Sequence, residues 1–154
     1  MNIHPTEVQF NKPHSTYLLV EMGTIKETAE LLYEQLHKSG YALLLSDILG
    51  ICLSETMNYA AWAVLESQKN ELGYPYIHQD TMLHGYEWAM IEMVIRAHCD
   101  LLQARMMEAT RSLGGDGFGM TVSEAQSNYV QEREKLQKLA SYEPPFSFKT
   151  LGGL

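Results

Sequence analysis

Apolar positions recur every three to four residues along four long stretches of the chain, which is the spacing of one face of an α-helix. Capping-box patterns open two of these stretches, Thr24 with Glu27 and Thr121 with Glu124. The pattern predicts an all-α fold, a single-domain bundle of four principal helices near residues 24–39, 46–70, 80–113 and 121–141.

The two ends of the chain lack this periodicity. We expect residues 1–23 to form an N-terminal arm, which ends in "STYLLVEMG", one strand or an extended segment with no second strand to pair with. Residues 24–141 then hold the bundle, in which Gly50 interrupts the second helix at a cost of about 1 kcal/mol relative to alanine. Residues 142–154 form an extended tail stiffened at its start by two prolines.

The long third helix carries apolar side chains on two opposite faces. One face holds Leu83, Tyr86, Met90, Met93, Ala97, Leu101 and Ala104, and the other holds Trp88, Ile91, Ile95, Cys99, Leu102 and Met106. Such a helix has neighbours on both sides, so we place it at the centre of the bundle. With Asp80 as its N-cap it would be about 50 Å long, and part of it should project and be covered by another chain.

Its polar residues raise the question of a metal or acid/base site. His84 lies three residues before Glu87, and Glu55 and Glu66 on the second helix offer further carboxylates. Di-metal carboxylate bundles need two His–Glu pairs, whereas here one occurs, in reversed order. We therefore favour a structural role for His84, hydrogen-bonded to Glu87 or to a backbone group, and keep a His84/Glu87 metal site as the alternative. We place Glu87 with His98 and Arg105 on one narrow polar edge of the helix.

Charge and composition limit the classes of partner that the chain is expected to bind. With 19 acidic and 11 basic residues the net charge is −8, and no basic cluster offers contacts to a nucleic-acid backbone. Cys52 and Cys99 fall in apolar helical patterns and suit buried thiols. No motif indicates a cofactor. Without a secretory pattern or a membrane-spanning run, we expect a cytoplasmic protein, in the host cytoplasm if a mobile element encodes it.

Nine Met and nine Tyr enrich the chain in residue types that gather at protein interfaces. We therefore expect a non-enzymatic, protein-binding helical protein, either an inhibitor or immunity-type module or a subunit of a larger assembly, with a protein partner or a second copy bound. The candidate contacts are Tyr74, Tyr76, Tyr86, Met90, Met93, Phe146, Phe148 and Leu151. The alternatives are a metal-binding four-helix protein and an oligomer that sequesters a small planar ligand.

Overall fold

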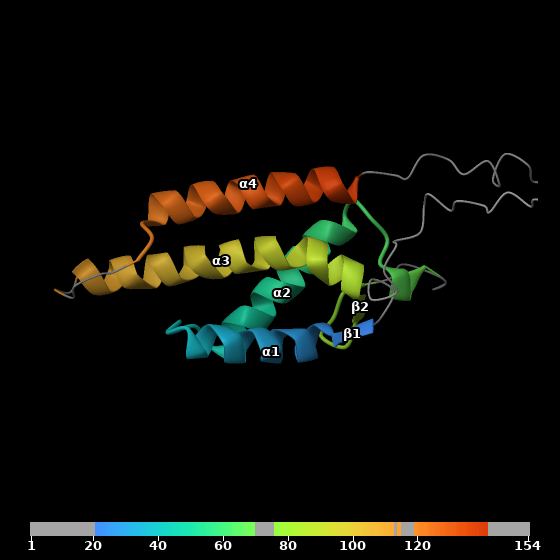
Figure 1. The fold of residues 1–154 in the computed structure, drawn as a ribbon, viewed down its shortest axis with the longest axis horizontal. Coiled ribbons are helices and arrows are strands. Elements are labelled where there is room, and N and C mark those ends of the chain that lie inside the picture. The colour runs from blue at the N-terminus through green and yellow to red at the C-terminus, as the bar shows by residue number, and fades with distance from the viewer. Residues whose placement is uncertain (1–20, 70–75, 113, 115–118, 142–154) are drawn as a thin grey trace, which may run out of the picture.

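The computed structural model describes residues 21–69, 76–112, 114 and 119–141. The described parts form four α-helices, one short 3₁₀ helix and two short strands (Figure 1). In chain order they are β1 (Glu21–Thr24), α1 (Ile25–Lys38), α2 (Leu45–Ala60), η2 (Glu66–Gln68), β2 (Met82–His84), α3 (Gly85–Ser112) and α4 (Val122–Ala140). The predicted all-α fold with four principal helices is confirmed.

Helix α3 is the central element, as its two apolar faces predicted. It lies between α1 and α4 in Figure 1, and α2 runs diagonally from the α1 side towards α4. The core where α1, α2 and α3 meet contains fully buried branched side chains, among them Ile25, Leu32, Ile48, Ile91 and Ile95. A second, smaller cluster joins α3 to α4 through Leu101, Ala104 and Ala125.

Both predicted capping boxes are present. The Thr24 hydroxyl accepts from the Glu27 backbone N–H at 3.2 Å, and the Glu27 carboxylate accepts from the Thr24 backbone N–H at 2.8 Å. Thr121 and Glu124 make the same reciprocal pair at the start of α4. Each box satisfies two N–H groups that have no partner inside the helix, which explains why these two starts were predicted to within one residue.

The predicted start of the third helix at Asp80 is wrong, because α3 begins at Gly85. The preceding segment is extended: β2 pairs antiparallel with β1, and the carbonyls of Gln79 and Thr81 accept from the first backbone N–H groups of α1 at 2.9 and 3.0 Å. If α3 had started at Asp80, the Thr81 carbonyl would point along the axis of α3 and could not accept from the first N–H groups of α1. The unsatisfied N–H groups of α1 thus hold this segment out of the helix.

The predicted end of the second helix at Asn70 is also wrong, because α2 ends at Ala60. Beyond it the chain turns so that Leu65 is fully buried and the backbone N–H of Glu66 donates to Glu87 at 2.7 Å. The apolar periodicity continues through this segment, but a tertiary hydrogen bond and a core contact override it.

The shorter α3 has 28 residues and a length of about 42 Å. Its C-terminal part extends past the other helices in Figure 1, and the side chains from Glu108 to Arg111 are exposed. The projection was predicted, and cover from another chain stays a prediction. No described helix is both long and apolar enough to cross a bilayer.

Candidate functional site

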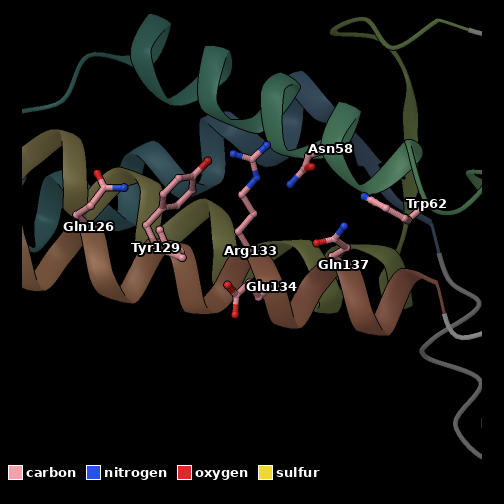
Figure 2. A pocket seen from close by; sticks show the side chains of 8 residues that line it. Asn58, Trp62, Gln126, Tyr129, Arg133, Glu134 and Gln137 are labelled. Atoms are coloured by element: carbon pink, nitrogen blue, oxygen red, sulfur yellow. The ribbon is translucent and has the colours of Figure 1, made fainter.

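A groove of about 390 Å³ lies between α4 and the C-terminal end of α2 (Figure 2). Asn58 in α2 and Trp62 just after α2 form one wall. The other wall belongs to α4 and consists of Gln126, Tyr129, Val130, Arg133, Glu134 and Gln137. The α4 positions recur at intervals of three and four residues, so one helix face supplies the whole wall.

Two side chains of this wall reach across the groove. Tyr129 and Arg133 extend from α4 towards α2, where Asn58 and Trp62 face them (Figure 2). Trp62 is 48% exposed and Val130 is 43% exposed, so apolar surface is open to the solvent here. None of the ion pairs among the described residues involves Arg133. Among the described residues, the groove therefore offers an open aromatic ring and, on the opposite wall, a guanidinium group without a carboxylate partner.

A buried carboxylate lies beneath the groove and joins three helices. Glu55 of α2 is 1% exposed, and its Oε1 accepts from the Tyr129 hydroxyl of α4 at 2.7 Å. The same oxygen lies 2.7 Å from Nδ1 of His98 on α3. The side-chain amide of Asn58 donates to Oε2 at 3.5 Å. Glu55 thus fixes the Tyr129 ring at the floor of the groove.

Burial raises the pKa of Tyr129 to about 12, and the hydrogen bond to Glu55 and the charge of Glu55 act in the same direction. Arg133 opposes this rise without cancelling it. The hydroxyl is therefore protonated at neutral pH and donates to the carboxylate. Because the Tyr129 hydroxyl already donates its proton in a hydrogen bond to Glu55, it is poorly placed to act as an acid or a base towards a substrate.

A second buried carboxylate, Glu87, lies in the first turn of α3. Glu87 is fully buried; Oε1 accepts from the Glu66 backbone N–H at 2.7 Å and Oε2 from the His84 backbone N–H at 2.8 Å. One side chain therefore caps the starts of both η2 and α3. The Tyr86 hydroxyl donates to Glu66 at 2.9 Å. Burial is the largest cause of the raised pKa of Tyr86, and this hydrogen bond is the second.

His84 is hydrogen-bonded to Glu87 as expected, but through its backbone N–H and not through Nδ1 of its ring. Its Nδ1 lies 3.8 Å from Oε2 of Glu87 and has no hydrogen-bond partner among the described residues. The backbone N–H of His84 binds Glu87 instead, because that group starts α3 and needs an acceptor. Across residues 21–69, 76–112, 114 and 119–141, no three His, Cys, Asp or Glu side chains converge as metal ligands.

The narrow polar edge expected on the third helix is present in α3. Glu87, His98 and Arg105 do share one edge of α3, but that edge faces other parts of the chain. Glu87 binds the backbone near η2, His98 binds Glu55, and Arg105 donates to Gln126 of α4 at 3.2 Å. Each polar group on this edge has a partner on a neighbouring segment, so the edge holds the bundle together.

The predicted partner contacts are spread over the molecule. Tyr76 is 73% exposed and Met93 is 56% exposed, whereas Tyr86 and Met90 are partly buried. Tyr74, Phe146, Phe148 and Leu151 lie outside the described residues, as does the predicted docking tail. Their role as a partner surface stays a prediction.

Sequence reasoning did not identify the residues around the groove. Glu55 carried a usable signal, because it is the one charged residue between Ile48 and Leu65 and shares a helix face with Cys52 and Tyr59. A carboxylate on an apolar face indicates a buried, hydrogen-bonded group. Trp62 and Arg133 carried no such signal, because only the packing of α2 against α4 brings them together.

We expect the protein to lose stability as the pH rises from about 9 to 12, because several buried acids ionise less readily in the folded chain. Burial raises the pKa of Tyr59 and Tyr129 from 10.0 to about 12, and that of Cys52 and Cys99 from 9.0 to about 12. A group whose pKa is raised by folding stabilises the folded chain fully below its unfolded-state pKa. This contribution is lost as the pH rises through the folded-state pKa. Urea unfolding at a series of pH values checks this, and a constant midpoint up to about pH 11 would contradict it.

The chain matches no protein-family model, no curated protein and no solved structure with which it was compared.

Proposed function

We propose that the protein is a non-enzymatic, protein-binding helical bundle whose α2–α4 groove holds an extended segment of a partner protein. The observation that carries this proposal is a groove lined by the open Trp62 ring, Arg133 and Tyr129. Trp, Tyr and Arg are the residue types that dominate binding energy at protein interfaces. An inhibitor or immunity-type module and a subunit of an assembly are both compatible with such a groove.

The polar lining suits a peptide backbone. Asn58, Gln126 and Gln137 each carry an amide that can donate and accept hydrogen bonds. An extended segment presents N–H and C=O groups in alternation, which such amides can bind on either side. An apolar side chain of the segment would lie against Trp62 and Val130, and a carboxylate would pair with Arg133.

The chemistry beneath the groove supports binding over catalysis. The carboxylate of Glu55 is covered by the groove floor and already accepts from Tyr129 and Asn58. The neighbouring His98 directs Nδ1 at the same carboxylate. These groups stiffen the floor, and a rigid floor lowers the entropy that a partner loses on binding.

Selection of a random peptide library against the full chain tests the proposal. The selected peptides should bind Trp62→Ala and Arg133→Ala about tenfold or more weakly than the original chain, by fluorescence anisotropy. Arg133→Lys should recover part of the loss, because it keeps the charge without the planar fork of donors. Leu31→Ala is the matched control, since Leu31 is 55% exposed on α1 and does not line the groove.

Two outcomes would overturn the proposal. The first is a selection that yields no peptide with measurable affinity. The second is a set of peptides whose affinity is the same for the original chain and for both groove variants.

A further inference from the structure

A second cavity, of about 410 Å³, lies between the C-terminal end of α1 and α3. Residues 39–41, directly after α1, form one wall, and Asp100, Gln103 and Met107 of α3 form the other. Met120, just before α4, also lines the cavity. None of these residues lines the α2–α4 groove, so the two sites are separate. The volume falls within the range of small-molecule sites, about 300 to 1,000 Å³.

Asp100 brings a carboxylate with one free oxygen to this cavity. Its Oδ1 accepts from the Tyr41 hydroxyl, whereas its Oδ2 accepts from no described residue. None of the ion pairs among the described residues involves Asp100. Arg96, one turn earlier on α3, donates to Glu92 and Gln35 instead. Within the described parts of the chain, this partly buried carboxylate therefore lacks a cation.

The Tyr41 hydroxyl positions Asp100 without neutralising it. Burial raises the pKa of Tyr41 to about 12, and the hydrogen bond to Asp100 and the charge of Asp100 act in the same direction. Arg96 opposes this rise without cancelling it. The phenol is therefore protonated and uncharged at neutral pH. The backbone N–H of Ala42 also donates to Oε1 of Gln103 at 3.0 Å, so hydrogen bonds join the two walls of the cavity.

The surroundings of Asp100 favour a positively charged group on an apolar chain. The C-terminal end of a helix carries a partial negative charge, and the residues that end α1 form one wall. The net charge of −8 attracts cations to the whole molecule. The remaining lining includes Ala104, Met107 and Met120, whose side chains can cover a hydrocarbon chain.

We propose that this cavity binds a primary ammonium group at the end of an apolar chain, with Asp100 as its counter-ion. A metal ion fits less well, because hard cations need several oxygen ligands and no three potential ligands converge among the described residues. The planar fork of a guanidinium binds both oxygens of a carboxylate, and Tyr41 already holds one oxygen of Asp100. An ammonium group needs one oxygen only. The site goes beyond the proposed groove function and does not depend on it.

Titration of the full chain with hexylamine, followed by NMR of isotope-labelled methionine methyl groups, tests the proposal. Hexylamine is protonated at neutral pH, as lysine is. The signals of Met107 and Met120 should shift, and hexanol, which has the same chain without the charge, should bind at least about tenfold more weakly. A capped lysine, N-acetyl-lysine-N-methylamide, separates two sources of the ammonium group. Affinity equal to that of hexylamine indicates a protein side chain, lower affinity indicates a free amine, and both support an ammonium site.

Three variants locate the site. Asp100→Asn should weaken hexylamine binding at least about tenfold, because it removes the counter-ion and keeps the side-chain shape. Glu108→Gln removes the same charge from an exposed position on α3 outside the cavity, and should bind as the original chain does. Met107→Trp leaves Asp100 in place and should abolish binding by filling the cavity.

Four results would each overturn the proposal. They are equal affinity for hexylamine and hexanol, equal affinity of the original chain and Asp100→Asn for hexylamine, unchanged binding by Met107→Trp, and the absence of any shift at Met107 and Met120. Melting curves of the variants show whether each is folded. If Asp100→Asn is unfolded, Met107→Trp and the comparison with hexanol still decide the question.

Discussion

Replacing Glu87 with alanine should lower the free energy of unfolding by about 3 kcal/mol. The change removes the acceptor of two backbone N–H groups, those of Glu66 and His84, at a position with no exposed surface. It uncaps η2 and α3 together and leaves a small cavity. Urea unfolding followed by circular dichroism measures the loss.

Two further variants separate these causes. Glu87→Gln keeps the side-chain volume but replaces one acceptor oxygen with an NH₂ group, which cannot accept from a backbone N–H. One of the two N–H donors therefore loses its partner, and this variant should also be destabilised. Glu92→Ala, on the same helix, removes a partly exposed ion pair with Arg96 and should cost less than about 1 kcal/mol. A Glu87→Gln protein as stable as the original would show that the carboxylate does not cap both segments.

The second large effect is expected at Glu55. Glu55→Ala should lower the free energy of unfolding by about 3 kcal/mol. Tyr129 and His98 lose their shared acceptor, and the hydrogen bonds that join α2, α3 and α4 are lost with it. Tyr129→Phe alone should cost about 1 to 2 kcal/mol, since the carboxylate keeps its contact with His98.

A double-mutant cycle measures how far these residues act together. If Tyr129 stabilises the fold through Glu55, adding Tyr129→Phe to Glu55→Ala should cost much less than it does alone, a coupling of about 1 kcal/mol. Glu30→Ala, on the exposed face of α1, is the matched control and should change stability by less than about 0.5 kcal/mol. Strict additivity of the two substitutions would contradict the shared hydrogen bond.

Local signals were enough to predict that four helices form and where the first and the last of them begin. Thr24 with Glu27 and Thr121 with Glu124 marked two helix starts, and both capping boxes are present in the structure. The central place of α3 followed from its two apolar faces. These features depend on residues close in sequence, so they can be read from the chain without knowledge of its packing.

The segment between α2 and α3 could not be predicted in this way. Its conformation depends on partners far along the chain: β1 pairs with β2, and the carbonyls of Gln79 and Thr81 accept from the start of α1. The apolar pattern from Met82 onwards suits a helix, and only these tertiary hydrogen bonds make it extended.

The polar stretch from His78 to Asp100 shows the same limit at the level of chemistry. Its histidines and carboxylates suggested a possible metal or acid/base site, and the sequence could not say which of them would meet. Glu87 binds backbone N–H groups, and His98 meets Glu55, a residue 43 positions earlier. The groove with Trp62 and Arg133 forms on the other side of this network, where the sequence held no recognisable pattern.

Glu55 and Glu87 each accept hydrogen bonds from described residues, and we expect both carboxylates to serve the fold and not to bind a metal ion. Metal analysis of the full chain, expressed with iron, manganese and zinc supplied, tests this most directly when combined with melting curves in the presence and absence of a chelator. We expect far less than one metal ion per chain and the same melting temperature in both conditions. One bound ion per chain whose removal lowers the melting temperature would contradict the account and support a metal site at His84 and Glu87.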